Sequence, residues 1–347
     1  MSLERFENEK EYRADKTLTN YSALKLFSVC PNLYREQYLT KEFEPEDKDY
    51  FLYGLLVDCI LTTPDETDNR FVRVDKKVDP QDRLQFEVDI KNLRKEMFEP
   101  GKDGKIMSEK ADGGNKTCIA GMAKREKEIA ELEAKINVIK NLGDKQQITA
   151  GMWKSALDTV EAIKNNPTFQ TLKFDELTSQ QIFVDPISKR KGITDHVVFH
   201  PSFRESYRLF RSGLLTGDKL REIAAALPEK ERTGWITDIK TTYLIKKFEP
   251  CMYAGQLANY QKLVEAVTGL TLKCRLVAGD KDSDVKCAQD YVFDQKLLDE
   301  AYKEYLEVET YFLASQRDNW YPSAKELRGK DQECFRCSIC RNRPLST

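Results

Sequence analysis

The chain has 347 residues, enough for one large domain or two small ones, and is 40% hydrophobic and 33% charged, as is typical of a soluble globular protein. With 56 basic and 58 acidic residues its net charge is −2, which excludes a globally basic nucleic-acid coat protein. No apolar run approaches the length of a membrane span, and residues 1–15 are polar. We therefore expect no membrane partner and a cytoplasmic location.

The N-terminal quarter of the chain contains two predicted elements. The pattern of residues 17–40 predicts a helix, and an apolar element follows from Phe51 to Leu61, just before Pro64. This apolar element contains one acidic residue, Asp58. An acid in such surroundings needs a partner that compensates for its burial.

Residues 80–167 have a different character, with charged, helix-like stretches on either side of a polar, Gly-rich loop over 101–117. From Ile129 to Leu142 apolar residues recur every three or four positions, which indicates a helix with one apolar stripe that ends at Gly143. We predict a helical insertion that packs as a structural arm, because the repeat is too short for a dedicated coiled coil.

The chain after Pro167 alternates between strand and helix patterns. Strands are predicted at 181–185, 192–199, 234–241 and 270–278, and helices at 218–226, 253–268 and 295–316. This order predicts an α/β protein in which helices flank one central mixed sheet.

Two of the predicted strands contain an aspartate inside a short apolar run, Asp195 in the first and Asp238 in the second. A buried carboxylate is costly unless it is compensated, and hard divalent cations are bound by carboxylate oxygens. Lys240 follows Asp238 by two residues and so lies on the same face of the strand. These groups suit metal-assisted phosphodiester hydrolysis, whereas the alternative is an ordinary structural ion pair on a strand.

The helix predicted after the Asp238 strand contains Tyr253, Gln256 and Tyr260 at spacings of three and four, so the three side chains share one face. The connection turns this face back toward Asp238 and Lys240. Gln and Tyr side chains can hydrogen-bond phosphate oxygens or bases, which suits the positioning of a nucleic-acid strand. The alternative is that the tyrosines are core residues.

Together these motifs resemble the PD-(D/E)XK nuclease superfamily, in particular its RecB-like and RecE-like exonuclease branch. The resemblance is carried by Gly192–Asp195, Thr237–Thr242, Gln256 with Tyr260, Tyr21–Leu24, Cys30–Pro31, Tyr34 and Gly54–Asp58. It implies a restriction-endonuclease-like core in which residues 1–347 form a single nuclease domain interrupted by the helical insertion at 80–167.

The resemblance also implies roles for particular residues. Asp195, Asp238 and the carbonyl of Ile239 would hold Mg²⁺ or Mn²⁺, and Lys240 would orient or deprotonate the attacking water. Asp58 stands where many relatives have a His ligand and is a further candidate metal ligand. Gln256 and Tyr260 would complete the catalytic set.

The implied function is that of a metal-dependent DNA exonuclease of phage or bacterial recombination or repair type. The alternatives are a nuclease subunit of a larger repair or CRISPR-adaptation assembly, and a catalytically silent, cluster-stabilised DNA-binding or scaffold protein. The implied partners are DNA, further copies of the chain in a homo-oligomer, and a single-strand annealing protein. Basic residues at 189–191 and 246–247 favour contact with DNA, although such runs are often solvated turns.

The C-terminal tail, residues 330–347, contains Cys334, Cys337 and Cys340 in a C-x-x-C-x-x-C run. Cysteines this close do not pair efficiently as disulfides, and triplets at this spacing are common around iron–sulfur clusters, with structural zinc and unligated thiols as the alternatives. The fourth ligand must come from elsewhere in the chain. Several RecB-like nucleases hold a [4Fe–4S] cluster with one cysteine before the core and three after it, and this resemblance assigns Cys30 as the fourth ligand.

Overall fold

The computed structural model describes residues 9–15, 18–29, 31–40, 49–101, 104–282 and 286–317. The chain forms two compact units, and each is described by itself. The core unit comprises 1–63 and 158–347, and the arm unit comprises Pro64–Leu157. Within the described ranges, no helix combines the length and apolar character needed to cross a membrane.

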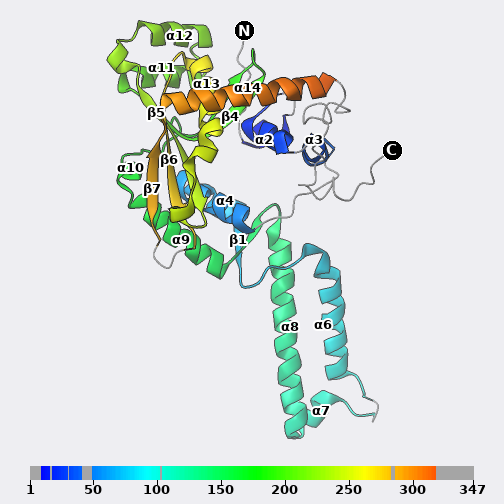
Figure 1. The fold of residues 1–347 in the computed structure, drawn as a ribbon. Helices are drawn as coiled ribbons and strands as arrows, with labels where there is room; N and C mark the ends of the chain where they lie inside the picture. Colours follow the sequence, from blue (N-terminus) through cyan, green and yellow to red (C-terminus); the bar gives the residue numbers. More distant parts are fainter. Residues whose placement is uncertain are drawn as a thin grey trace. The chain divides into compact units, whose positions relative to one another are not determined.

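A five-stranded sheet lies at the centre of the core unit (Figure 1). Its order is β3-β4-β5-β6-β7, where β5 and β6 run parallel and the other neighbours antiparallel. The strands are β3 (Ser179–Asp185), β4 (Arg190–Phe199), β5 (Gly234–Thr242), β6 (Lys273–Asp280) and β7 (Ala288–Val292). The predicted α/β class with a mixed sheet and flanking helices is confirmed. The short edge strand β7 was not predicted from the sequence.

Helix α13 (Ala254–Thr268) connects the parallel strands β5 and β6 and packs on the sheet. It ends as predicted at Gly269, whose φ of +77° is the left-handed conformation that glycine adopts without strain. Leu257 and Val264 of α13 are fully buried in the main hydrophobic core. The predicted helix at 295–316 is α14 (Gln295–Arg317), which packs along α13 (Figure 1).

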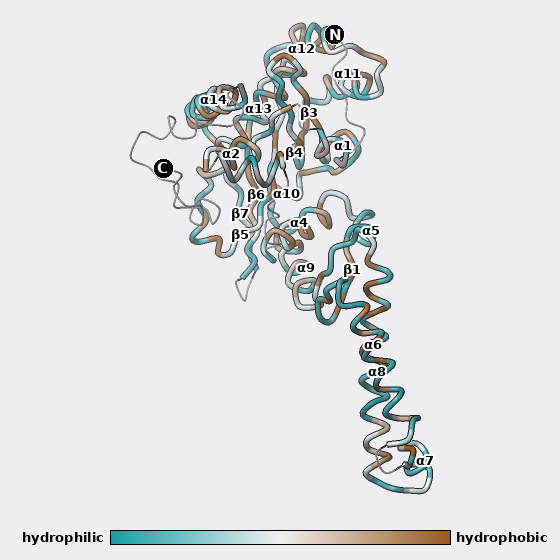
Figure 2. The backbone as a smooth tube through the Cα atoms, turned by 90° about the vertical axis from the view of Figure 1, so that its right-hand side faces the viewer, coloured by the Kyte–Doolittle hydropathy of each residue, from teal (hydrophilic) through white to brown (hydrophobic). Residues whose placement is uncertain are grey.

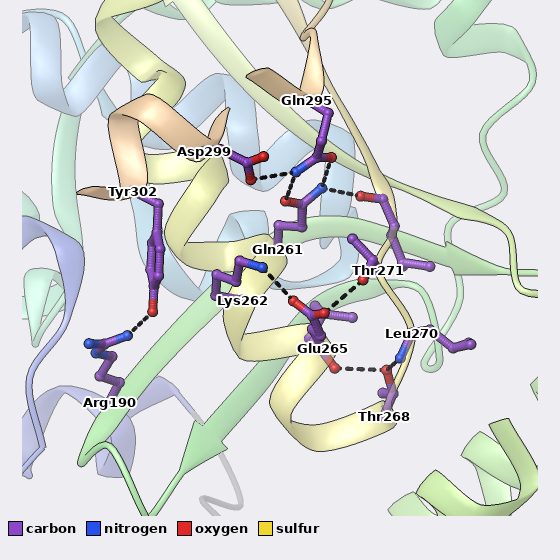
Figure 3. A network of polar contacts seen from close by, with 12 residues as sticks. Arg190, Gln261, Lys262, Glu265, Thr268, Leu270, Thr271, Gln295, Asp299 and Tyr302 are labelled. Carbon is purple, nitrogen blue, oxygen red and sulfur yellow. Dashed lines mark hydrogen bonds and ion pairs between the residues drawn. The ribbon is translucent and has the colours of Figure 1, made fainter. Parts of the chain in front are cut away.

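Polar contacts fix α13 to its surroundings (Figure 3). The side-chain amides of Gln261 on α13 and Gln295 on α14 donate to each other, each at 3.0 Å. Gln261 also donates to the Leu272 carbonyl at 2.6 Å, and the Thr271 hydroxyl after the helix donates to Glu265 at 2.8 Å. These contacts hold the helix that carries Gln256 and Tyr260 in one position over the sheet.

The start of β4 is also tied to other elements through two buried basic side chains. Arg190 forms a two-pronged ion pair with Glu309 on α14. It also donates to the Tyr302 hydroxyl, as Figure 3 shows. Lys191 donates to the backbone carbonyls of Tyr12 and Asp15, the latter at 2.6 Å. The expectation that this basic run contacts DNA is therefore wrong for Arg190 and Lys191, whose side chains are occupied inside the fold.

Two expected regions of the core unit differ in detail from the prediction. In place of one helix over 17–40, the described residues form α2 (Tyr21–Val29), α3 (Pro31–Tyr34) and a π-helical turn (Arg35–Leu39), and a short helix that was not predicted, α1 (Glu9–Ala14), precedes them. Pro31 begins a new helix because its fixed φ suits a first turn. After β4 the chain forms α11 (Pro201–Arg211) before the predicted helix, now α12 (Gly217–Ala226). The apolar element around Asp58 is helix α4 (Asp49–Thr62).

The arm unit consists mainly of two long helices that lie side by side, α6 (Arg83–Phe98) and α8 (Lys116–Leu142) (Figure 1). Ion pairs Arg94–Glu133 at 2.8 Å and Arg125–Glu96 at 2.7 Å connect them. In Figure 2 both helices alternate between hydrophilic and hydrophobic colours, as one apolar stripe on a charged helix requires. As predicted, α8 ends before Gly143, but the expected loop contains α7 (Met107–Asp112).

The remaining elements of the arm unit are short. Strands β1 (Phe71–Val74) and β2 (Gln146–Thr149) form a two-stranded parallel sheet that was not predicted from the sequence. The short helix α5 (Thr67–Arg70) directly precedes β1. Helix α9 (Ala150–Lys164) begins in the arm unit, and its last residues belong to the core unit. In the core unit α10 (Pro167–Gln170) precedes β3.

Candidate active site

The candidate site lies where β4 and β5 stop pairing. Their ladder runs from Phe199 opposite Gly234 to His196 opposite Thr237. At the next position, Oδ2 of Asp195 accepts a hydrogen bond of 2.8 Å from the backbone N–H of Ile239. The carboxylate thus replaces the backbone partner that a continuing ladder would supply. In an extended strand the N–H and C=O of one residue point to the same side, so the Ile239 carbonyl also faces this gap.

Strand β3, the other neighbour of β4, is also irregular next to Asp195. The β3–β4 register pairs Ser179 with His196 and Gln181 with Thr194, and passes over Gln180 and Asp195. Gln180 has a φ of +47°, which is uncommon for a non-glycine residue and is a form of backbone strain that often accompanies functional sites. Asp195 therefore sits at an irregularity shared by both neighbouring strands.

Asp238 on β5 is completely buried and lies beside the Lys240 ammonium, with 2.6 Å between Oδ2 and Nζ. Among the described residues, no group donates an aligned hydrogen bond to this Oδ2. The other oxygen, Oδ1, accepts from the Gln256 amide at 3.3 Å. Burial raises the pKa of Asp238 to about 7, because the charge of Lys240 only partly offsets desolvation and the nearby Asp195 raises it further.

Lys240 joins the acidic groups of the site. Burial by itself would lower the pKa of Lys240, but the carboxylates of Asp238 and Asp195, together with Asp58 farther away, outweigh burial and raise it. The side chain is therefore a stable ammonium in the protein without a bound metal. Its Nζ also lies 5.7 Å from the centre of the Tyr253 ring, which contributes a cation–π contact.

Gln256 and Tyr260 reach the site from α13. The Gln256 amide donates to the Tyr260 hydroxyl at 2.8 Å as well as to Asp238. Burial, followed by the charges of Asp238 and Asp195, raises the pKa of Tyr260 well above its ordinary value, so its hydroxyl stays neutral. The two residues form a neutral hydrogen-bonding wall beside the carboxylates.

Gly192 on β4 allows this wall to approach the sheet. A Cβ atom at position 192 would lie 2.8 Å from Cδ1 of Leu263 and 3.1 Å from the Tyr260 ring. The first of these distances is shorter than real Cβ contacts, so a side chain here would force Leu263 or the Tyr260 ring to move.

Helix α4 brings Asp58 to the same region. Gly54, one turn earlier on α4, packs against β5, where an added Cβ would lie 3.3 Å from the Thr241 hydroxyl. The Asp58 carboxylate lies 3.3 and 3.4 Å from the Gln180 side-chain amide. The charge of Asp58 also contributes to the raised pKa of Lys240. It is held by the residue whose backbone is strained.

The oxygen atoms of the site suit a hard divalent cation that takes only a few of its ligands from the protein. Within the described ranges, no three His, Cys, Asp or Glu side chains gather closely enough to hold a metal ion by themselves. A magnesium ion needs fewer, because it keeps several waters and is usually bound by one or two carboxylates. Asp195 and Asp238 supply two carboxylates, and the buried Oδ2 of Asp238 lacks an aligned donor. A cation would add a second positive charge beside Asp238 and reduce the repulsion between the two acids.

The predicted catalytic residues therefore meet in the structure, and two further residues join them. Tyr253 lies on the same side as Gln256 and Tyr260, as its spacing predicts, but the contact of its ring with Lys240 follows only from the fold. Gln180 was missed, because nothing in a polar residue at a strand start signals a positive φ. The predicted cluster ligands Cys30, Cys334, Cys337 and Cys340 lie outside the described residues.

Comparisons with known proteins bear on the fold. No family model matches this chain, and no curated protein sequence matches it. A crystal structure of a protein named "Putative exonuclease", from Eubacterium rectale, is similar to this one with a TM-score of 0.50. The match has 15% sequence identity and covers 99% of this chain and 96% of that chain. At this identity the likeness concerns the fold alone, and this chain shares the overall fold of that protein.

Proposed function

We propose that this protein is a metal-dependent deoxyribonuclease of the PD-(D/E)XK type. The observation that carries the proposal is the meeting of Asp195, Asp238 and Lys240 where β4 and β5 separate. Two carboxylates and an ammonium at one strand irregularity match the chemistry of phosphodiester hydrolysis, in which charge develops on a phosphate. The similarity in fold to a protein named as a putative exonuclease supports the same function.

In this proposal Asp195, Asp238 and the Ile239 carbonyl hold Mg²⁺ or Mn²⁺, and Asp58 is a further ligand candidate. When bound, the cation stabilises the negative charge that develops on the scissile phosphate and makes water a better nucleophile. The Ile239 N–H holds the Asp195 carboxylate in place, and the Gln256 amide does the same for Asp238. The Lys240 ammonium, which lies beside the Asp238 carboxylate, would orient the attacking water or a phosphate oxygen.

The substrate in this proposal is DNA attacked from a strand end. The likeness to a protein named as an exonuclease favours end-directed cleavage over internal cleavage. Lys246 and Lys247, which follow β5 and are exposed, are available to neutralise backbone phosphates, whereas Arg190 and Lys191 are not. The biological setting proposed is recombination or repair.

The test compares two DNA substrates that differ in whether they have ends. Linear end-labelled DNA and covalently closed circular DNA are incubated with the protein and Mg²⁺, Mn²⁺ or EDTA. We expect the linear DNA to release labelled nucleotides only with a metal, and the closed circle to remain intact. Cleavage of both substrates would contradict end-directed action, and cleavage of neither with either metal would contradict a nuclease.

A further inference from the structure

A pocket of about 290 Å³ opens next to the candidate active site, between α2, the start of α13 and α14. Its volume is near the lower end for small-ligand sites, which start at about 300 Å³. The residues that define its walls and rim are Tyr21, Leu24, Lys25, Met252, Glu304 and Tyr305. The pocket is thus built on the elements that also support the active site.

Two tyrosine rings and several apolar side chains contribute to the walls of this pocket. The rings of Tyr21 and Tyr305 are stacked, with centroids 6.2 Å apart and an angle of 14° between their planes. Leu24 contributes buried aliphatic surface, and Met252 is 60% exposed at the opening. Tyrosine rings and a polarisable thioether are suited to contact with a flat π-system.

The charges at the rim are balanced. Exposed Lys25 and Glu304 both border the pocket. The Glu304 carboxylate disfavours a phosphate in this pocket. A neutral ligand that has both hydrogen-bond donors and acceptors on its edge can bind to Lys25 and Glu304 at once. Burial, then Glu304 and Tyr253, raise the pKa of Tyr21, so the wall itself stays uncharged.

One aromatic ring, that of Tyr253, lies near a residue of the pocket and near a residue of the candidate active site. Lys240 Nζ lies 5.7 Å and Lys25 Nζ 6.0 Å from the centroid of the Tyr253 ring. Gly255, which borders the pocket, immediately precedes Gln256 of the active site. A nucleotide whose phosphate lies beside Lys240 therefore has this pocket as a neighbour.

We propose that this pocket receives one nucleobase of the DNA strand that is being cleaved, next to the scissile phosphate. The proposal rests on the proposed nuclease function. The base would stack against the rings of Tyr21 and Tyr305 and so position the substrate strand. Lys25 and Glu304 would lie at the edge of the base. Stacking of this kind accepts any base, because every base has a π-face. The enzyme would accordingly grip its substrate strand with little sequence preference.

The test measures the affinity of the intact protein for short single-stranded DNA with calcium ions in place of magnesium. An abasic residue is placed in turn at each of the positions nearest the end. For wild type, we expect one position at which the abasic residue weakens binding by about tenfold. In Ser28→Trp, which fills the pocket from exposed Ser28 on α2, the same abasic residue should change affinity by less than about twofold.

Matched variants separate this effect from general damage. Ile187→Trp adds the same side chain to a fully separate, 85% exposed turn and should behave as wild type. Met252→Ala removes one wall at an exposed position, so it tests the pocket even if Ser28→Trp does not fold. Competition by free deoxyadenosine distinguishes a nucleoside site from a strand site, and the proposal predicts competition that is weaker than that of the strand by more than about tenfold.

Two results would overturn the pocket proposal. One is equal binding of intact and abasic strands by wild type, and the other is unchanged sensitivity to the abasic residue in both pocket variants. If wild type cleaves DNA but shows either result, the pocket proposal fails and the proposed nuclease function stands. If the abasic pattern appears as expected but no cleavage occurs with Mg²⁺ or Mn²⁺, the nuclease function fails and the pocket remains a nucleobase site.

Discussion

Asp195 and Ile239 are joined by a hydrogen bond of 2.8 Å in which the carboxylate accepts from the backbone N–H. This bond anchors one proposed metal ligand to the strand that carries the other, at the level where β4 and β5 no longer pair. It explains how the chain can open a gap between two strands and still keep Asp195 and Asp238 together.

Two substitutions at Asp195 separate its structural and chemical roles. Asp195→Asn keeps an oxygen that can accept from the Ile239 N–H, so we expect near-normal stability but a loss of cleavage rate of about 100-fold or more. Asp195→Ala also leaves the N–H without its partner and should lose about 1–3 kcal/mol of unfolding free energy. Chemical denaturation and a cleavage assay measure the two effects. Wild-type cleavage by Asp195→Asn would contradict the proposed ligand role.

The raised pKa of Asp238 predicts how stability depends on pH without metal. Its folded-state pKa of about 7 lies above the ordinary value of 3.8, so the native protein holds this proton more tightly than the unfolded chain. The contribution to stability is fully present below about pH 4 and is lost as the pH rises through about 7. In EDTA, thermal melts should therefore show wild type losing stability relative to Asp238→Asn over this range.

Magnesium provides the control for this pH effect. A bound cation would place positive charge beside the Asp238 carboxylate and stabilise its ionised form. The loss of stability at higher pH should therefore be smaller when Mg²⁺ is added. A difference between wild type and Asp238→Asn that stays constant with pH would show that the carboxylate is not desolvated as the structure indicates.

Gly192 offers a test of how closely α13 must approach the sheet. Gly192→Ala places a methyl group 2.8 Å from Leu263 and should cost about 1–3 kcal/mol while lowering activity through a displaced Tyr260. Gly151→Ala on α9 is the matched control, because open space surrounds the new Cβ and alanine favours a helix by about 0.5–1 kcal/mol. Equal stability changes in the two variants would contradict the packing account.

The buried ion pair between Arg190 and Glu309 gives a prediction about stability alone. Glu309→Ala leaves the guanidinium buried without its counter-ion and should cost about 3–5 kcal/mol. Replacing both partners by apolar residues, in Arg190→Met with Glu309→Leu, should recover a large part of that loss. Urea denaturation of the single and double variants tests this, and a single variant as stable as wild type would count against the pair.

Much of the site could be predicted because strand alternation and helix periodicity fix which side chains share a face. Asp238, Lys240, Gln256 and Tyr260 were correctly placed in this way. The burial of Arg190 could not be read locally, since its partner Glu309 lies 119 residues away. The strained backbone of Gln180 likewise depends on the neighbouring strands.

Other differences from the prediction have separate causes. Helix α11 did leave a signal in the sequence, with Phe203, Tyr207 and Phe210 at helical spacing after a proline, and this signal was missed. In β7, residues 288–292 lack the alternation that marks a half-buried strand.

The cysteines at the C-terminal end of the sequence predict a second metal site. If Cys334, Cys337 and Cys340 act with Cys30, the protein purified without oxygen should be brown and contain about four iron atoms per chain. Replacing Cys337 by serine should reduce the iron content and the visible absorbance. A colourless protein with one zinc per chain would favour the structural zinc site instead.

The most direct test of the central claim is the rate at which end-labelled linear DNA is degraded in Mg²⁺ by wild type, Asp238→Asn and Asp299→Asn. Asp299 is an exposed acid on α14 that serves as a matched control. We expect wild type and Asp299→Asn to degrade the DNA at similar rates and Asp238→Asn to be slower by about 100-fold or more. Equal rates for all three proteins would contradict the claim that Asp238 holds the metal for catalysis.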